Sequence, residues 1–496
     1  MTHDADVAVI GAGPAGLAAA VTVAAAGRDV VLVDAAPRPG GQYYRHRAAE
    51  SGGAADLGGL RDRLGGVRYL SGHRVWHVEP GFVVHALAGD RDERAVEIRA
   101  TTLVLATGAH DRALPFPGWD LPGVLTAGAA QALVKGNGVT AGTRTVVAGT
   151  GPFLLPVAVG LAAAGGAIAG VFEANRPYRP YRFGAALARH PARLAEGAGY
   201  AAALARARIP YRMGRAVVAA HGEDAVTAVT VARLDAGWRP IAGTERTVAC
   251  DTVAVGYGFT PQLEIPLQLG CATRVATDGN LVVAVDAAQR TSVPGVYAAG
   301  EITGIGGAHL AVVEGELAGH AAGSIGSVAG SAGPLGGAGG GATGRIRRLL
   351  ARRRRLRAFA AAMHAAYPIR PGWPAWLRDD TVVCRCEEVP YARLAAAVDL
   401  GATDPRAVKL LSRAGMGWCQ GRVCGHAAAV LTARAMGRDL GAADLIGLAR
   451  RPIAQPIRLG DLAGEAAATF EAHVTYEAYD ALEAPEAPEA HEKENP

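Results

Sequence analysis

The sequence predicts an α/β chain with two similar units, each a strand, a glycine turn, a helix and a second strand, followed by a small cysteine-bearing helical domain. Two uncharged apolar runs, at 7–27 and 146–172, are each broken by a glycine-rich turn after a few residues. This pattern is typical of a strand that leads into a helix and differs from a single membrane-spanning helix. Strand–helix–strand units of this length form parallel sheets with right-handed crossovers. Four of the six cysteines fall within residues 384–424.

Length and composition limit the class of protein. The chain has 496 residues, enough for about three domains. Half of the residues are hydrophobic and 19% are charged, which excludes wholesale disorder, and six cysteines are too few for a disulfide scaffold. The net charge of +5 sums an arginine-rich segment at 345–357 and an acidic tail at 471–496. Nothing in this balance favours nucleic-acid binding, and we expect no membrane span. The N-terminus lacks a basic leader segment, so we expect a soluble, cytoplasmic protein.

The first unit carries the turn GAGPAG between its first strand and its helix. Gly11 permits a tight turn, Gly13 lets the backbone approach a pyrophosphate, and Gly16 lets the helix pack closely on the strand. Asp34 ends the second strand, where an acid accepts hydrogen bonds from a ribose. The motif therefore predicts a dinucleotide site, without distinguishing FAD from NAD.

The second unit repeats the pattern with GTGPFL. Gly149 and Gly151 match the first two glycines, whereas Leu154 replaces the third and Glu173 ends the following strand. A carboxylate there would bind a ribose diol and repel a 2′-phosphate, so we expect NAD or another unphosphorylated adenine nucleotide. The alternative is a domain that is retained for its fold alone.

The C-terminal cysteines form a C-x-C pair and a C-x₄-C pair. Four thiolates can ligate either a tetrahedral zinc ion or a [2Fe–2S] cluster. Zinc sites favour C-x₂-C spacings, which neither pair matches, so the cluster is the favoured interpretation and zinc remains the alternative. The four predicted ligands are Cys384, Cys386, Cys419 and Cys424.

The other two cysteines are not expected to have a redox or ligand role. Cys250 and Cys271 are far apart in the sequence, and neither belongs to a C-x-x-C pair near a fingerprint. Thiol–disulfide reduction needs such a dithiol, so that activity is excluded. We expect both residues to be small buried hydrophobes.

Residues 1 to about 330 resemble the two-dinucleotide flavoprotein superfamily of thioredoxin reductase and ferredoxin reductase. The resemblance rests on GGQ at 40–42, ATG at 106–108 and VYAAGEI at 296–302, in addition to the two fingerprints. It implies FAD at the first fingerprint, with Glu301 where the family usually has Asp, and a helix that begins near Gly307 and points at the flavin. The FAD contacts that it implies are Gly11, Gly13, Pro14, Ala15, Gly16, Asp34, Gly41, Gln42, Val75, Ala106, Thr107, Gly108, Gly300, Glu301, Gly307 and Ala308.

The segment CRCEEV…LSRAGMGWCQGRVCG resembles the [2Fe–2S] domain of the bacterioferritin-associated ferredoxin type. Together with ATGAHDRALPFPGWDLPGV and AGEITGIGGAHLAVVEG, it makes the chain similar to the α (A) subunit of hetero-oligomeric amine and imino acid dehydrogenases. That family includes opine oxidase, dye-linked proline or hydroxyproline dehydrogenase and bacterial hydrogen cyanide synthase.

The resemblance implies a specific division of labour. A separate subunit that resembles D-amino-acid oxidase would oxidise the C–N bond of an opine, proline, hydroxyproline or glycine. The present chain would relay the electrons, with a small ferredoxin-like protein as a further partner. Two alternatives stay open: a self-sufficient NADH-dependent flavin and iron–sulfur reductase, and a zinc-stabilised regulatory flavoprotein.

We expect the chain to divide into an FAD-binding domain interrupted by a second nucleotide-binding domain, then a linker, a cluster domain and a tail. The arginine-rich helix after the linker is expected to be solvated or docked on a partner. The expected bounds are 1–117 and 251–328 for the FAD-binding domain, 118–250 for the inserted domain, 329–379 for the glycine-rich linker and arginine-rich helix, 380–445 for the [2Fe–2S] domain and 446–496 for the C-terminal extension with its acidic tail.

Overall fold

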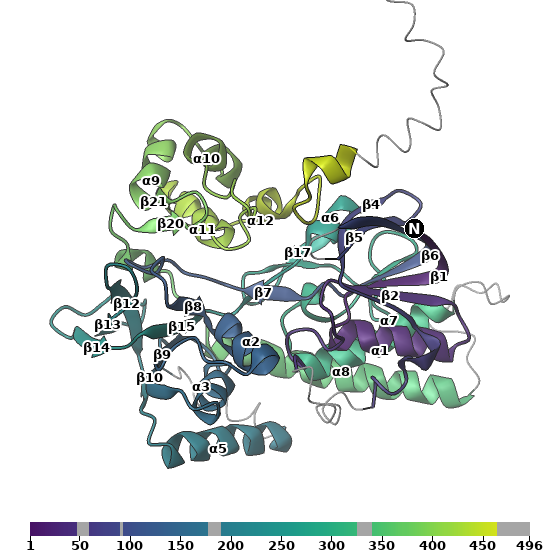
Figure 1. Cartoon of the computed structure of the whole chain (residues 1–496), viewed down its shortest axis with the longest axis horizontal. Helices are drawn as coiled ribbons and strands as arrows, with labels where there is room; N and C mark the ends of the chain where they lie inside the picture. The colour runs from purple at the N-terminus through teal and green to yellow at the C-terminus, as the bar shows by residue number, and fades with distance from the viewer. Residues whose placement is uncertain (47–58, 90–92, 177–189, 325–339, 464–496) are drawn as a thin grey trace, which may run out of the picture.

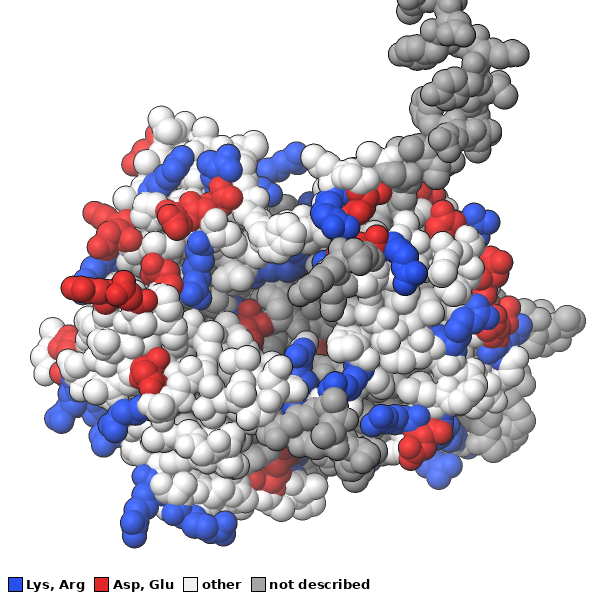
Figure 2. Space-filling model, viewed as in Figure 1, with Lys and Arg blue, Asp and Glu red and all other residues white. Residues whose placement is uncertain are grey.

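The computed structural model describes residues 1–46, 59–89, 93–176, 190–324 and 340–463. Figure 1 shows two α/β units joined by a narrow pair of strands, with the C-terminal helices lying across both units. Acidic and basic side chains interleave over the face shown in Figure 2. The glycine-rich part of the predicted linker and the acidic tail fall largely outside the described residues. Within those ranges, no helix combines the length and the hydropathy that a bilayer crossing requires.

The first unit is built on a seven-stranded sheet with the order β3-β2-β1-β6-β5-β4, in which β19 pairs with the end of β6. The second half of β1, from Val7 to Ile10, and nearly all of β2 are apolar and buried, because both faces of the sheet are covered there. The strands of this sheet are β1 (Thr2–Ile10), β2 (Val30–Asp34), β3 (Arg68–Ser71), β4 (His73–Glu79), β5 (Val83–Ala88), β6 (Arg94–Leu105) and β19 (Val296–Ala298).

Two helices from opposite ends of this unit pack side by side below the sheet, as Figure 1 shows. They are α1 (Pro14–Ala25), which follows the first fingerprint, and α7 (Ala308–Gly323). The close approach depends on Gly319, where a Cβ would lie 2.6 Å from the carbonyl oxygen of Ala19. Short 3₁₀ segments, η2 (Leu64–Gly66) and η3 (Gly300–Thr303), complete the unit.

The second unit contains a five-stranded parallel sheet with the order β11-β10-β9-β15-β8, and a three-stranded antiparallel sheet, β12-β13-β14. Because β15 pairs with β9 and β8, this unit extends through Gly256, beyond the boundary expected at residue 250. Its elements are β8 (Val124–Thr126), α2 (Ala127–Asn137), β9 (Arg144–Gly149), α3 (Leu154–Ala163), β10 (Ala167–Glu173), α5 (Pro191–Arg206), β11 (Tyr211–Met213), β12 (Arg215–His221), β13 (Ala228–Arg233), β14 (Arg246–Ala249) and β15 (Thr252–Gly256).

Two antiparallel strands connect the units, so the chain crosses between them twice along one ribbon. They are β7 (Ala109–Asp111) and β16 (Phe259–Pro261). After β16 the chain returns to the first unit through α6 (Glu264–Gln268), β17 (Thr273–Val275) and β18 (Leu281–Val283).

The C-terminal part begins with α8 (Gly340–Ala366), which runs along α7. The 3₁₀ segment η4 (Trp373–Trp376) anchors to the second unit, where the Trp376 indole N–H donates to the carbonyl oxygen of Trp238 at 2.9 Å. A compact helical domain follows, and its elements are β20 (Val382–Cys384), β21 (Val389–Pro390), α9 (Tyr391–Asp399), α10 (Pro405–Ser412), α11 (Gly425–Ala435) and α12 (Ala442–Ala449).

Candidate functional site

The first fingerprint loop joins β1 to α1 and leaves its centre open. Gly11 has φ +103°, and a Cβ at either Gly11 or Gly16 would overlap a backbone oxygen, so both positions require glycine. No atom lies within 4 Å of the position that a Cβ would occupy at Gly13. A pyrophosphate could therefore approach the backbone at Gly13, next to the N-terminus of α1 where Pro14 and Ala15 begin the helix.

Asp34, at the end of β2, holds this loop in place. Its carboxylate accepts hydrogen bonds from the backbone N–H groups of Ala12 at 2.5 Å and Ala36 at 2.7 Å. Burial raises the pKa of Asp34 above its usual value, and the two backbone hydrogen bonds oppose that shift. Each carboxylate oxygen keeps a further lone pair for a ribose hydroxyl. Val75 of β4 is half-buried in the core that also contains Val33 of β2.

The GGQ segment folds over the fingerprint loop. The N–H of Gly40 donates to the carbonyl oxygen of Ala12 at 2.8 Å. Gly41 has φ +59°, and a Cβ there would lie 2.9 Å from Cα of Gly13. Gln42 is exposed at the rim. These contacts bring two sequence-predicted segments to the same loop.

Two other predicted segments meet at this end of the sheet. β6 ends just before the predicted segment Ala106–Gly108. Within that segment, the Thr107 hydroxyl donates to the carbonyl oxygen of Gln262 at 2.9 Å. β19 ends just before Gly300, where a Cβ would lie 3.0 Å from Cβ of Ala15. The carboxyl ends of β1, β6 and β19 thus gather the predicted FAD segments at one edge, as expected for a ligand of an open α/β sheet.

Glu301 holds the loop that leads into α7. Its two carboxylate oxygens accept the backbone N–H groups of Gly306 at 2.9 Å and Gly307 at 2.8 Å, just ahead of α7. Burial raises the pKa of Glu301 to about 7, against the opposing effect of these two hydrogen bonds. The first intrahelical bonds of α7 come from residues 310 and 311, so the N–H groups of Ala308 and His309 at the helix N-terminus have no intrahelical acceptor.

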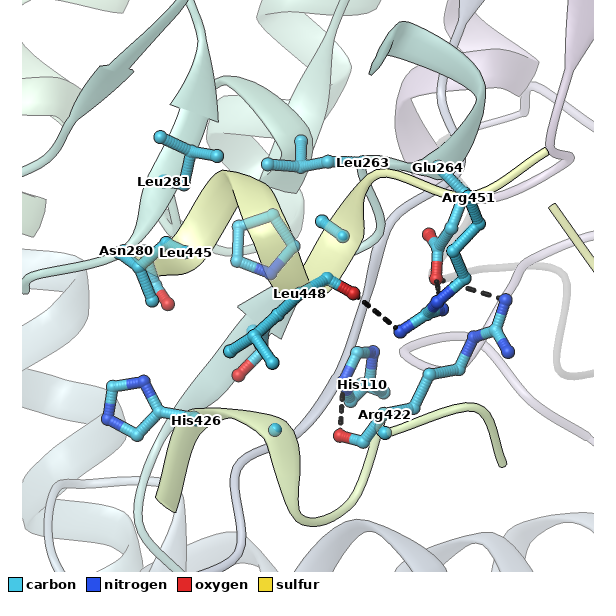
Figure 3. A pocket seen from close by; sticks show the side chains of 15 residues that line it. His110, Leu263, Glu264, Asn280, Leu281, Arg422, His426, Leu445, Leu448 and Arg451 are labelled. Carbon is cyan, nitrogen blue, oxygen red and sulfur yellow. Dashed lines mark hydrogen bonds and ion pairs between the residues drawn. The ribbon is translucent and has the colours of Figure 1, made fainter. Parts of the chain in front are cut away.

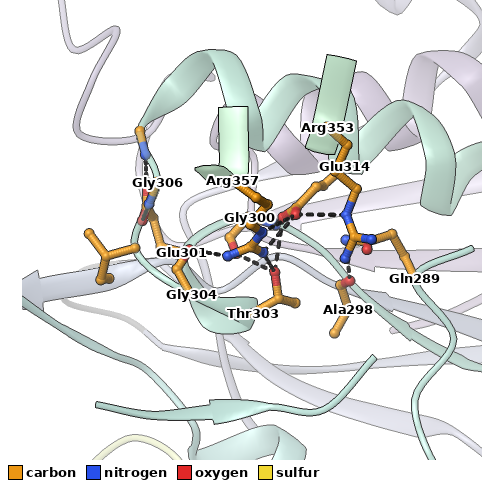
Figure 4. A network of polar contacts seen from close by, with 12 residues as sticks. Gln289, Ala298, Gly300, Glu301, Thr303, Gly304, Gly306, Glu314, Arg353 and Arg357 are labelled. Carbon is orange, nitrogen blue, oxygen red and sulfur yellow. Dashed lines mark hydrogen bonds and ion pairs between the residues drawn. The ribbon is translucent and has the colours of Figure 1, made fainter. Parts of the chain in front are cut away.

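Next to the loop that precedes α7 lies a buried ionic network that the sequence did not predict (Figure 4). Glu314 of α7 is fully buried and accepts hydrogen bonds from the Thr303 hydroxyl at 2.9 Å and from the Nε atoms of Arg353 at 3.1 Å and Arg357 at 2.9 Å. It also accepts the N–H of Gly300 at 3.2 Å. The arginine-rich helix α8 is therefore docked on α7 within this chain, whereas the sequence suggested a solvated helix or one docked on a partner.

The second fingerprint is assembled but its acid is enclosed. Glu173 has no exposed surface and accepts the N–H of Gly151 at 2.7 Å, the Thr150 hydroxyl at 2.8 Å and the N–H of Asn175 at 2.8 Å. Burial raises the pKa of Glu173 to about 7. Gly149 ends β9 directly against β15. A ribose would have to compete for a carboxylate that is already satisfied.

A segment between α8 and η4 covers this acid. The Asn175 side-chain amide donates to the carbonyl oxygen of Pro368 at 2.9 Å, and Cβ of Tyr367 lies 4.0 Å from the position of a Cβ at Gly151. The predicted contact between Glu173 and a ribose is therefore not available in this arrangement, which depends on residues far from the fingerprint.

The four C-terminal cysteines come together as two pairs. The Sγ atoms of Cys386 and Cys419 lie 3.3 Å apart, and Cys424 donates a hydrogen bond that helps lower the pKa of the Cys384 thiol to about 6. The N–H of Gly415 donates to the Cys384 sulfur at 3.3 Å. Burial and the neighbouring thiols raise the pKa of Cys424, with its bond to Cys384 as the largest cause.

This arrangement suits two iron atoms better than one metal ion. A [2Fe–2S] cluster needs four thiolates spread over two irons, which two pairs can supply. Gly417 is required beside them, because a Cβ there would lie 2.5 Å from Cβ of Cys386. Cys250 and Cys271 are buried elsewhere, as expected.

The cluster loop touches the flavin unit at a polar junction (Figure 3). His110 of β7 bonds through Nε2 to the carbonyl oxygen of Arg422 at 2.9 Å. Glu264 of α6 pairs with Arg422 at 3.0 Å and with Arg451 at 2.8 Å, beside a small pocket of about 60 Å³. Nothing in the sequence predicted that His110 and Glu264 would contact the cluster loop.

Comparison with known proteins agrees with this geometry. A family model described as pyridine nucleotide-disulphide oxidoreductase matches residues 5–315, and one described as a BFD-like [2Fe-2S] binding domain matches residues 382–434. The hydrogen cyanide synthase subunit HcnB of Pseudomonas aeruginosa is 36% identical over 425 residues, covering 84% of this chain and 90% of that protein. The A subunit of opine oxidase from Agrobacterium tumefaciens is 33% identical over 485 residues, covering 92% of this chain and 91% of that protein.

Among solved structures, L-proline dehydrogenase from P. horikoshii matches with a TM-score of 0.65 at 21% identity, covering 93% of this chain and 80% of that chain. This likeness supports the fold. The two family models confirm the predicted α/β flavoprotein architecture and its two cofactor types, FAD and a [2Fe–2S] cluster. The chain belongs to the pyridine nucleotide-disulphide oxidoreductase family, as a flavin oxidoreductase with a C-terminal BFD-like [2Fe–2S] domain, alongside HcnB and the A subunit of opine oxidase.

Proposed function

We propose that this chain is the electron-relaying subunit of a hetero-oligomeric dehydrogenase that oxidises the C–N bond of an amine or imino acid, such as an opine, proline, hydroxyproline or glycine. The observation that carries the proposal is the direct contact between the flavin unit and the cluster loop, His110 to Arg422 at 2.9 Å. When bound, FAD takes up electrons in pairs and the [2Fe–2S] cluster passes them on singly.

For FAD, we propose that the open loop at Gly13 and the N-terminus of α1 hold the pyrophosphate, and that Asp34 accepts the ribose hydroxyls. The GGQ loop closes over the pyrophosphate through Gly41. The N-terminus of α7, at Ala308, donates to the flavin pyrimidine ring, and Glu301 fixes the loop ahead of that helix.

For the cluster, we propose Cys384, Cys386, Cys419 and Cys424 as the ligands. Cys384 and Cys424 are buried and Cys386 is exposed, so one edge of the cluster would face the interior and the other solvent. We also propose a cytoplasmic location, a reducing compartment in which thiolates stay available as ligands.

For partners, we propose a flavoprotein subunit resembling D-amino-acid oxidase as the electron donor, with a small ferredoxin-like protein as a further component of the complex. Support comes from the names of HcnB and its opine oxidase relative, which mark both proteins as subunits.

The main competitor is an NADH-dependent reductase that would accept hydride at the second fingerprint. The enclosed state of Glu173 argues against it. The deciding test is anaerobic stopped-flow absorbance of the purified holoprotein, alone and with its partner. We expect amine substrate to bleach the flavin only when the partner is present and NADH to have no rapid effect. Rapid bleaching of the isolated chain by NADH would refute the relay role.

The zinc alternative is decided by metal analysis and by EPR spectroscopy of the dithionite-reduced protein. We expect about two irons per chain and a rhombic signal. Zinc without that signal would overturn the cluster assignment.

A further inference from the structure

The junction between the flavin unit and the cluster domain is built around the loop that carries two of the proposed cluster ligands. Arg422 lies between Cys419 and Cys424, and its backbone carbonyl receives the His110 contact at 2.9 Å. His110 lies in β7, shortly after Thr107, which itself follows the carboxyl end of β6 where the predicted flavin contacts gather. A short chain of bonds therefore joins the flavin edge to the cluster loop.

A buried carboxylate fastens this loop to the flavin unit. Glu264 is 6% exposed, and one of its oxygens pairs with Nη2 of Arg422 at 3.0 Å and with Nη1 of Arg451 at 2.8 Å. Both arginine side chains are largely buried as well, and both come from the cluster side of the junction (Figure 3). One carboxylate of the flavin unit thus balances two cations, Arg422 of the cluster domain and Arg451 of the C-terminal extension.

The guanidinium of Arg422 also forms hydrogen bonds within the ligand loop, so its pairing with Glu264 connects that loop to the flavin unit. Its Nη1 donates to the carbonyl oxygen of Cys419 at 3.3 Å and to the side chain of Gln420 at 3.2 Å. Its Nη2 also donates to the carbonyl oxygen of Ala454, whose own N–H donates to the carbonyl oxygen of Trp76 in β4 at 2.6 Å. The ligand loop, the C-terminal extension and the flavin unit are therefore joined at one side chain.

We propose that Glu264 is a positioning residue that holds the cluster-bearing loop 419–424 against α6, and that electrons pass between the flavin unit and the cluster domain by way of the His110–Arg422 contact. The inference rests on the proposed relay function, because it concerns electron transfer within this chain. In that step an electron leaves the reduced flavin and reduces the cluster, and no bond is made or broken. The rate of such a step falls steeply with distance, so a loosened junction slows it.

The test compares Glu264→Gln with the wild-type holoprotein. Glutamine keeps the size of the side chain but leaves two buried guanidinium groups without a counter-charge. Glu264→Asp keeps the charge and serves as the conservative variant. Glu316→Gln is the matched control, because Glu316 also pairs with a distant arginine, Arg345 at 3.0 Å, but lies on α7 away from the junction.

The flavin is reduced by light with EDTA as the electron source under anaerobic conditions, and the cluster EPR signal is followed by rapid freezing. This route bypasses NADH and the partner protein, so its outcome is independent of what supplies electrons in the complex. We expect the EPR signal to appear about tenfold or more slowly in Glu264→Gln, because two buried guanidinium groups without a counter-charge no longer hold the ligand loop against α6, and electron transfer slows steeply with distance. Glu264→Asp should lie nearer to wild type, and Glu316→Gln should match it.

Two further measurements separate positioning from general damage. The final EPR line shape and the iron and FAD contents should be unchanged in Glu264→Gln, whereas hydrogen exchange in residues 419–424 should be faster. An unchanged rate in Glu264→Gln would overturn the proposal. A slower rate accompanied by an altered EPR spectrum or by lost iron would also overturn it, because Glu264 would then support cluster binding itself.

Discussion

Replacing Gly41 by alanine tests how the GGQ loop closes over the first fingerprint. Gly41 has φ +59°, a conformation that costs a residue with a Cβ about 1–2 kcal/mol. The added Cβ would lie 2.9 Å from Cα of Gly13, a backbone atom that cannot turn aside, so the two loops must move apart. Overpacking of this kind costs about 1–3 kcal/mol. Because Gly13 is where the pyrophosphate is proposed to approach, we expect FAD affinity to fall roughly five- to hundredfold.

The control separates backbone strain from the steric effect. Gly27 also has a positive φ, +75°, but a Cβ there would meet no atom within 4 Å. Gly27→Ala should therefore lose about 1 kcal/mol of stability and keep its FAD affinity. Both are measured by titrating the apoproteins with FAD and by chemical denaturation. Equal FAD affinity in Gly41→Ala and Gly27→Ala would refute the reasoning that places the pyrophosphate between these loops.

Three other outcomes follow from the same geometry. Cys386→Ser should lose the EPR signal of the reduced cluster while keeping the flavin absorbance; a retained signal would contradict its role as a ligand. Glu314→Ala should destabilise the protein by about 2 kcal/mol. This is less than breaking a buried ion pair usually costs, because the side chains of Arg353 and Arg357 are 19% and 24% exposed and can be hydrated again. Unchanged denaturation curves and unchanged hydrogen exchange of α7 and α8 would contradict this. Burial raises the pKa of Glu173 to about 7 in the folded protein. The stabilisation linked to this shift is full at a pH below the pKa that Glu173 has in the unfolded chain, and it is lost as the pH rises through about 7. Glu173→Gln should remove that part of the pH dependence of Tm, and parallel Tm curves for variant and wild type would argue against the shift.

Local spacing was enough to predict the two fingerprints and the cysteine quartet. In each case the residues that act together are close in the sequence or end adjacent strands of a parallel sheet, so strand order alone brings them together. The crosswise pairing of Cys386 with Cys419 and of Cys384 with Cys424 was not predicted, because each pair joins residues that are distant in the sequence.

Contacts between distant charged residues could not be predicted in this way. Glu314 shares α7 with a second acid, Glu316, and nothing local in the sequence pointed to Arg353 and Arg357 in α8 as its partners. Glu264 and Arg451 likewise lie 187 positions apart and meet only after both units have folded. Such pairs form only when whole domains pack together, so they cannot be predicted from a single sequence.

The two fingerprints show how far such packing alters the meaning of a motif. Asp34 and Glu173 occupy equivalent strand ends, and each accepts a backbone N–H from its own glycine loop. Asp34 keeps part of its surface exposed, whereas Glu173 has none, because Asn175 and the backbone of Pro368 lie over it. Pro368 follows α8, the same helix that Glu314 ties to the loop ahead of α7. Access of a ribose to Glu173 would therefore require the segment at Pro368 to move, whereas Asp34 needs no such movement.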